Sequence, residues 1–158
     1  MEDQYEKDRL PQRMQDVLKI IGENAVLFRL YVMLTEFPEW SVYQNLEDKG
    51  CDIVLINSHK NPPHNKIRIE VKTRQRLHST AKNAKSNPHF TLSEHENECD
   101  FLIAYWFDKN QYYIVPTEVL KPTKNKRKNL YKFIPTVEST KLYLNKWELI
   151  KELISEFQ

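Results

Sequence analysis

The sequence predicts an α/β fold with a mixed, mostly antiparallel central sheet of four or five strands, flanked by N-terminal and C-terminal helices. Residues 52–56 form a nearly continuous apolar run and residues 66–72 alternate, as strands do. Apolar side chains at three- and four-residue spacings predict helices before Pro38 and after Asn145. The chain of 158 residues is long enough to bury one core, so we expect a single domain over residues 1–158.

The N-terminal helical pattern starts at Leu10 and continues beyond Gly22. We expect one broken helix or two abutting helices, because glycine weakens a helix interior near this point. Pro38 ends the second helix, since the residue before a proline disfavours helical geometry. A first strand is then expected near residues 41–45.

The strongest pattern is the pair of strands at 52–56 and 66–72. The second strand alternates, with apolar side chains on one face and Arg68, Glu70 and Lys72 on the other. Asp52 opens the first strand. If the two strands pair antiparallel across the intervening loop, Asp52 lies at the same end of the sheet as Glu70 and Lys72.

The second half of the chain predicts further elements of the sheet and a last helix. Residues 100–107 are apolar and predict a buried strand, and residues 112–115 return beside it. A short helix is expected over residues 116–120, and the basic stretch 121–132 predicts a loop. Asn145 is expected to cap the last helix, whose apolar stripe docks on the sheet or on a second subunit.

A local capping signal precedes the strand at 100–107. Ser93 and Glu96 match a capping box, in which each side chain bonds to the backbone of the other residue. A short helix is therefore expected to begin there. The preceding stretch, residues 74–88, is basic, small and polar, and predicts a loop beside the strand that carries Lys72.

Asp52, Glu70 and Lys72 together suit phosphodiester chemistry. Magnesium takes oxygen ligands and is commonly held by one or two carboxylates, with waters and substrate phosphates completing its shell. An adjacent lysine can orient the attacking water and offset charge in the transition state. A Glu-x-Lys tripeptide alone is usually an exposed ion pair on a solvated strand. The aspartate before the hairpin is what favours a site.

Aspartate, hairpin and Glu-x-Lys in this order resemble the PD-(D/E)XK nuclease superfamily, which includes restriction enzymes, archaeal Holliday-junction resolvases and some homing endonucleases. The resemblance spans roughly residues 20–118. It implies a restriction-endonuclease-like core. It also implies Asp52 and Glu70 as metal ligands, the Val71 carbonyl as a further ligand, and Lys72 as the catalytic lysine.

The resemblance also suggests two additional site residues. Glu23 follows Gly22 on the N-terminal helix and corresponds to the helix glutamate of the family, although many relatives place that glutamate where this chain has Val26. Gln75 resembles a glutamine that some members place near the metal. The cofactor implied is Mg2+, with Mn2+ able to substitute, and no small-molecule cofactor is expected.

Basic residues are concentrated in two windows. Residues 71–93 contain five Lys or Arg and residues 121–137 contain six, with no acid in either window, although the whole chain carries a net charge of only +2. Such segregation is typical of a surface that contacts a polyanion, although a basic loop is more often only a solvated face. The residues expected to bind nucleic acid are Arg74, Arg76, Lys82, Lys85, Lys124, Lys126, Arg127 and Lys128.

Cysteine usage and hydropathy bound the environment. Cys51 and Cys99 are the two cysteines of the chain, and no apolar segment of a secretory signal stands at the N-terminus. We therefore expect a cytoplasmic protein with free thiols rather than a disulfide. No stretch approaches transmembrane length, so no membrane partner is expected.

These observations favour a magnesium-dependent endonuclease that acts on DNA. The rival is a non-catalytic nucleic-acid-binding or complex-forming module on the same fold, because a fold does not establish an activity. An RNA-processing nuclease would use the same site. A homodimer is a possible assembly, since a small domain with one site must pair with another to cut both strands together.

Overall fold

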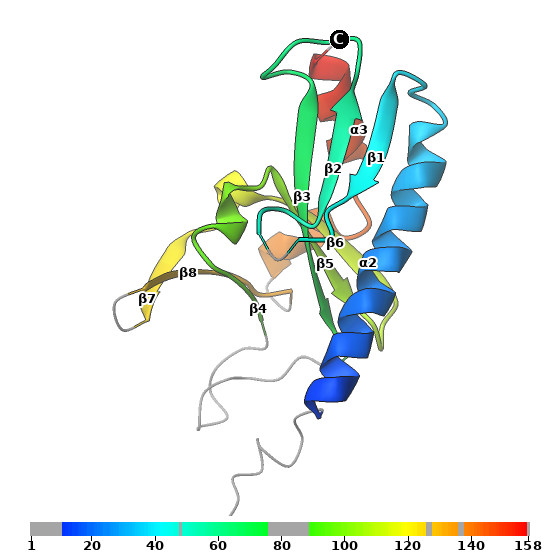
Figure 1. The fold of residues 1–158 in the computed structure, drawn as a ribbon. Coiled ribbons are helices and arrows are strands. Elements are labelled where there is room, and N and C mark those ends of the chain that lie inside the picture. The colour runs from blue at the N-terminus through cyan, green and yellow to red at the C-terminus, as the bar shows by residue number, and fades with distance from the viewer. Residues whose placement is uncertain (1–10, 48, 76–88, 126–127, 136–137, 158) are drawn as a thin grey trace, which may run out of the picture.

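A computed structural model of the chain describes residues 11–47, 49–75, 89–125, 128–135 and 138–157. Its centre is a five-stranded mixed sheet with the strand order β1-β2-β3-β5-β6 (Figure 1). The strands of this sheet are β1 (Trp40–Gln44), β2 (Ile53–Asn57), β3 (Lys66–Arg74), β5 (Phe101–Trp106) and β6 (Gln111–Pro116). The predicted fold class, a mixed and mostly antiparallel sheet flanked by helices, is confirmed.

The pairing at the centre of the sheet places the predicted site. β2 and β3 are antiparallel, with Ile53 opposite Ile69, so Asp52 stands beside Glu70 where β2 begins and β3 continues past the hairpin. β3 and β5 form the parallel pair of the sheet, with Glu70 opposite Leu102. The antiparallel hairpin expected from residues 52–72 is therefore confirmed.

Two helices cover one face of the sheet. Helix α2 (Gln12–Leu34) and helix α3 (Glu148–Glu156) share a core with β1, β2, β3, β5 and β6. Leu30 and Ile150 are both fully buried in this core. The apolar stripe of the last helix thus docks on the sheet.

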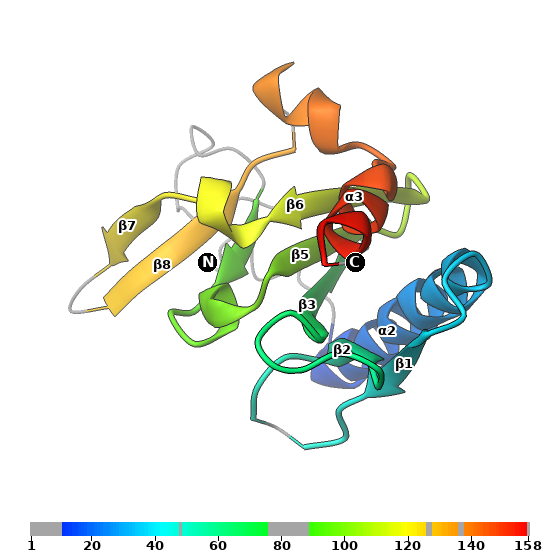
Figure 2. The same ribbon diagram turned by 90° about the horizontal axis from the view of Figure 1, so that it is seen from above.

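The other face of β5 and β6 carries a second, smaller sheet that the sequence did not predict. It has the order β4-β8-β7 and consists of β4 (Phe90–Leu92), β7 (Pro122–Asn125) and β8 (Lys128–Phe133). Its core contains Phe90 and Phe133 together with Leu102 and Ala104 of β5. The expectation of a basic loop over residues 121–132 is wrong, because β7 and β8 form a hairpin there. This hairpin and α2 lie on opposite sides of the molecule (Figures 1 and 2).

Helix α2 is continuous, so the expected split near Gly22 is wrong. A Cβ atom at position 22 would lie 1.7 Å from Thr73 Oγ1 on β3. The glycine therefore marks the place where helix and strand cross closely, and the packing between them offsets the weak helix propensity of glycine.

Asn145 does not cap the last helix. Its backbone adopts a left-handed conformation with φ of 52°, and α3 begins after Trp147. The Asn145 side chain accepts a hydrogen bond from the Tyr112 backbone N–H, and its own N–H donates to the Tyr112 carbonyl. The residue is thus engaged with the edge of β6 instead of with the helix.

Cys51 and Cys99 form a disulfide, so the expectation of free thiols is wrong. The bond joins the residue before Asp52 to the residue before Asp100 at the start of β5. It is buried within the fold, where β2 and β5 flank the central strand β3. Within the described residues, no helix combines the length and the apolar character needed to cross a membrane.

Candidate active site

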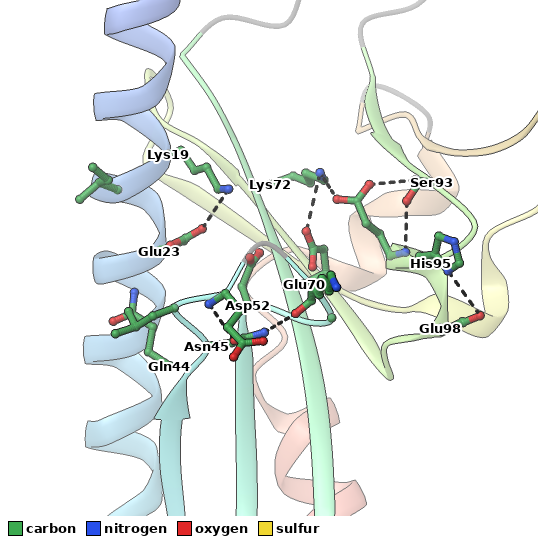
Figure 3. A pocket seen from close by; sticks show the side chains of 16 residues that line it. Lys19, Glu23, Gln44, Asn45, Asp52, Glu70, Lys72, Ser93, His95 and Glu98 are labelled. Atoms are coloured by element: carbon green, nitrogen blue, oxygen red, sulfur yellow. Dashed lines mark hydrogen bonds and ion pairs between the residues drawn. The ribbon is translucent and has the colours of Figure 1, made fainter.

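A cavity of about 940 Å³ lies where α2, the β1–β2 connection, β3 and the segment 93–98 meet (Figure 3). Charged and polar side chains from all four contribute to its lining. Those that matter for its chemistry are Lys19, Glu23, Asp52, Glu70, Lys72, Ser93 and Glu96. Residues that are far apart in the sequence thus share one solvent-accessible space.

Asp52 is anchored by the backbone of the neighbouring strand. Its Oδ2 atom accepts a hydrogen bond of 2.8 Å from the Val71 N–H. The side chain is half-buried and lines the cavity. Because a strand backbone donates this bond, the carboxylate is held next to Glu70 without help from a flexible side chain.

Glu70 is the most buried acid of the cavity, with only 5 % of its surface exposed. Burial, a hydrogen bond with Glu96 and the charge of Asp52 raise its pKa above the ordinary value. Its Oε2 atom is buried and has no hydrogen-bond partner among the described residues. Unsatisfied buried oxygens are rare in native proteins, and one that faces a cavity is suited to a ligand.

Lys72 is held between two carboxylates. Its Nζ atom lies 3.7 Å from Glu70 Oε1 and also bonds to Glu96 Oε2. Only 29 % of the lysine side chain is exposed, so these contacts are partly shielded from water. The ammonium group is therefore positioned at the cavity instead of extending into solvent.

Glu96 is itself fixed by the predicted capping box. Its Oε1 accepts a 2.9 Å hydrogen bond from the Ser93 N–H, and the Glu96 N–H donates to Ser93 Oγ at 3.2 Å. Burial alone would raise the pKa of Glu96, but hydrogen bonds with Glu70, Lys72 and the Ser93 backbone lower it well below its ordinary value. Glu96 is thus an ionised partner for Lys72 at the start of the short 3-10 helix η1 (Glu96–Glu98).

Glu23 brings a further carboxylate from helix α2. Burial and the charge of Asp52 raise its pKa, while Lys19, 3.9 Å away, opposes this shift. Figure 3 shows Glu23, Asp52 and Glu70 gathered in the same part of the cavity. Val26, the alternative position for the helix glutamate, is fully buried in the core and does not reach the cavity.

The remaining predicted residues lie away from these carboxylates. Gln75 follows β3 and does not line the cavity; its backbone carbonyl accepts a hydrogen bond from the Asp108 N–H. Arg74, Lys124 and Lys128 are exposed. The other five residues expected to bind nucleic acid lie outside the described residues: Arg76, Lys82, Lys85, Lys126 and Arg127.

Comparison with known proteins gives structural matches only. No protein-family model matches the chain, and no curated protein matches its sequence. A Holliday junction resolvase from the archaeal hyperthermophile Archaeoglobus fulgidus superposes with a TM-score of 0.54 and 19 % sequence identity, over 84 % of this chain and 94 % of the resolvase. A bacterial homing endonuclease superposes with a TM-score of 0.53 and 17 % identity, over 87 % of this chain and 93 % of that protein.

Both neighbours are members of the PD-(D/E)XK fold. This chain has the restriction-endonuclease-like fold. The fold resemblance expected from Asp52, Glu70 and Lys72 is confirmed. Because the identities are low, the likeness concerns the fold, and the chemistry has to be argued from the site.

The carboxylates of this cavity match the oxygen ligands that a hard divalent cation prefers. The described residues contain no group of three or more Asp, Glu, His or Cys side chains arranged to hold a metal by themselves. Asp52 and Glu70 nevertheless line the same cavity, and the unpaired Glu70 Oε2 provides a free oxygen ligand. Two carboxylates with open positions are typical of magnesium, which retains waters and binds substrate phosphate.

Glu96 is the site residue that sequence reasoning did not assign. The capping-box pattern identified its role at the start of a helix, and the structure confirms that role. Its contact with Lys72 joins residues separated by 24 positions, and no local pattern indicates which strand the helix start will approach.

Proposed function

We propose that this protein is a metal-dependent endonuclease that hydrolyses phosphodiester bonds of DNA. One observation carries the proposal: Asp52, Glu70 and Lys72 line one cavity, at the end of the antiparallel hairpin of a restriction-endonuclease-like fold. Two structural neighbours, a Holliday junction resolvase and a homing endonuclease, make a nuclease the activity that best suits this fold.

In this proposal the acids bind the cofactor. Asp52 and Glu70, with the Val71 carbonyl, would hold Mg2+ or Mn2+, and the ion would stabilise the charge that develops on the scissile phosphate. Glu70 must then release the proton that its raised pKa favours. Glu23 adds negative charge near Asp52 and would strengthen the attraction for a cation.

Lys72 would act directly on the reacting atoms. The oxygen of a water molecule attacks the phosphorus and gives up a proton to solvent or to a nearby base. The bond from phosphorus to the leaving oxygen breaks, and that oxygen takes up a proton from solvent. The Lys72 ammonium orients this water and offsets the growing negative charge on the phosphate. Glu96, which bonds to Lys72, is a positioning residue that keeps the ammonium group at the cavity.

We propose that the basic β7–β8 hairpin contacts the DNA backbone. Lys124 and Lys128 are exposed on its two strands, close to the turn. Asn129 Nδ2 donates a 2.8 Å hydrogen bond to Glu94, which lies in the segment that lines the cavity. The hairpin is thus connected to the cavity wall, and phosphates bound to it would continue toward the site.

The decisive experiment compares wild type with Lys72→Ala on labelled duplex, branched and single-stranded DNA and on RNA, with magnesium, manganese or a chelator. We expect metal-dependent cleavage of DNA by wild type and loss of most cleavage by the variant, with substrate affinity nearly unchanged, because Lys72 acts mainly in the transition state. Lys66→Ala, an exposed lysine at the other end of β3, is the matched control and should cleave normally.

Other outcomes separate the rivals. A wild type that binds DNA and cuts none of the substrates supports a non-catalytic module on the same fold. Preferential cleavage of RNA supports the RNA-processing alternative. Equal cleavage by wild type and Lys72→Ala contradicts the site.

The role of Glu96 has its own test. Glu96→Gln keeps the shape but removes the negative charge that holds Lys72, so the lysine samples more positions. We expect turnover to fall by about 10- to 100-fold with little change in KM, whereas Glu98→Gln, an exposed neighbour on η1, should have no effect. A rise in KM at unchanged turnover would instead assign Glu96 to substrate binding.

A further inference from the structure

The outer face of α2 carries most of the large hydrophobic side chains that are exposed among the described residues. The described residues include twelve exposed large hydrophobic side chains, and seven of these belong to α2. Phe28 is 69 % exposed and Ile20 is 59 % exposed. The inner face of the same helix is also apolar, with Val26 and Leu30 fully buried against the sheet. A helix that is apolar on both faces normally buries both.

The spacing along the outer face is that of a helix-pairing seam. Steps of three and four residues alternate without interruption through Met14, Val17, Ile21, Asn24, Phe28 and Tyr31. This is the a/d pattern of a coiled coil, in which a single polar residue commonly sets the register of the pair. Asn24 is the one polar member of the seam and lies near its middle.

No other described element covers this face. Figures 1 and 2 show α2 at one side of the molecule, with β1, β2 and β3 on its inner side and nothing of the described chain against its outer side. From exposed fractions between 42 % and 69 %, the seven side chains leave on the order of 700 Å² open, since large apolar side chains present roughly 150–250 Å² each. A standard interface buries about 800 Å² per partner.

We propose that the outer face of α2 is the interface through which a second copy of this chain docks. A seam that is apolar apart from one central asparagine is self-complementary, as a two-fold symmetric interface requires. Pairing of two copies would bury an area close to that of a stable dimer. None of the six seam residues is charged at neutral pH. The seam therefore offers no attraction to a charged partner.

The proposed interface adjoins the active-site cavity. Ile20 belongs to the exposed apolar face and also lines the cavity, beside Lys19 and Glu23 of the same helix. A second copy docked on α2 would therefore lie along the rim of each cavity and bring the two sites onto one assembly. The dimer itself does not depend on catalysis, so its test is independent of the proposed endonuclease activity.

The first experiment measures molecular mass in solution by sedimentation equilibrium for the full chain. We expect wild type to be a dimer at micromolar concentrations. Phe28→Glu should raise the dimer dissociation constant by at least about 30-fold, the effect of losing one dominant aromatic contact. Leu142→Glu, at an apolar side chain of similar exposure in the 3-10 helix η3 (Glu138–Tyr143), is the matched control and should remain dimeric. A monomeric wild type overturns the proposal, and so does a Phe28→Glu protein that dimerises like wild type.

A second experiment does not depend on the folding of a charged variant. Any symmetric pairing that covers the whole seam brings its middle against itself, whether the two helices run parallel or antiparallel. Asn24→Cys should therefore cross-link to a covalent dimer on mild oxidation, since the two native cysteines are already paired with each other. Leu142→Cys should stay monomeric on a denaturing gel. Equal cross-linking of both variants, or of neither, contradicts an interface on α2.

Discussion

Glu70 should give the metal-free protein an unusual dependence of stability on pH. Burial, the hydrogen bond with Glu96 and the charge of Asp52 raise its pKa in the folded state above the ordinary 4.5. Above that value the unfolded chain has lost a proton that the folded protein still holds, so the free energy of unfolding falls as the pH rises toward the folded pKa. Glu70→Gln removes this dependence and should be more stable than wild type at about pH 8 but not at about pH 5.

The measurement is urea-induced unfolding with a chelator present at both pH values. Glu96→Gln is the control, because the pKa of Glu96 is lowered in the folded state. Its contribution is present above the unfolded value of 4.5 and is lost only as the pH falls below it. Loss of Glu96 should therefore destabilise the protein at both pH values. A constant difference between Glu70→Gln and wild type would mean that Glu70 is ionised in the folded state.

At the scale of single residues, sequence reasoning works where strand periodicity fixes direction. The alternation of β3 places Glu70 and Lys72 on one face, and the antiparallel pairing with β2 leaves Asp52 beside them. Glu96 escapes the same reasoning, because its position depends on how the chain returns from β3 through β4. Its capping role is local and readable, whereas its contact with Lys72 is tertiary.

At the scale of elements, the crossing of α2 and β3 sets the position of Glu23 on the helix. Gly22→Ala would place a Cβ atom 1.7 Å from Thr73 Oγ1, so the helix must move away from the strand. We expect a loss of stability of about 1–3 kcal/mol, the range for overpacking of a tight contact. The variant should also bind Mg2+ more weakly, because Glu23 is displaced from Asp52.

Thermal unfolding and calorimetric titration with Mg2+ would measure both effects. Gln12→Ala is a suitable control for helix substitution, because Gln12 is exposed at the start of the same helix and lies outside both the cavity lining and the apolar seam. It should leave both stability and metal affinity close to wild type. A Gly22→Ala protein with wild-type stability would show that the helix and strand can separate without cost.

Element boundaries illustrate where local signals conflict with packing. Gly22 predicts a break by its propensity, yet α2 continues through it because only glycine fits against Thr73. The stretch 121–132 predicts a loop by its charge, yet Leu130 and Tyr131 lie on β8, which pairs with β4 as well as β7. A short polar hairpin can be predicted as a pair of strands only when the further strand against which it packs is known.

At the scale of the whole molecule, the layered arrangement follows from the alternating faces of β5. Ile103 joins the core beneath α2 and α3, and Leu102 joins the core beneath the small sheet. The continuous apolar run of β5 predicts that both of its faces are buried. It does not predict which elements cover each face. The disulfide between Cys51 and Cys99 could not be predicted from local sequence either. The two residues are 48 positions apart, and only the order of strands in the sheet brings them together. The pairing also removes the argument from free thiols for a reducing compartment.

The distribution of charge over the whole molecule leads to a prediction about DNA affinity. Each phosphate contact releases counterions, so the logarithm of the binding constant falls with the logarithm of salt concentration by about 0.9 per contact on duplex DNA. If Lys124 and Lys128 of the β7–β8 hairpin both contact phosphates, the double variant Lys124→Ala/Lys128→Ala should flatten this slope by about two units.

The control removes the same charge from the far end of β3. Lys60 and Lys66 are exposed, and Lys66 begins the strand whose other end carries Lys72. The double variant Lys60→Ala/Lys66→Ala lowers the net charge equally, so a purely long-range effect would weaken binding in both proteins to a similar extent. Fluorescence anisotropy over a range of salt concentrations, with a chelator present to prevent cleavage, would measure the slopes. If the salt dependence becomes less steep only in the hairpin variant, the phosphate contacts belong to β7 and β8. If the hairpin variant keeps the slope of wild type, the hairpin is not part of the DNA interface.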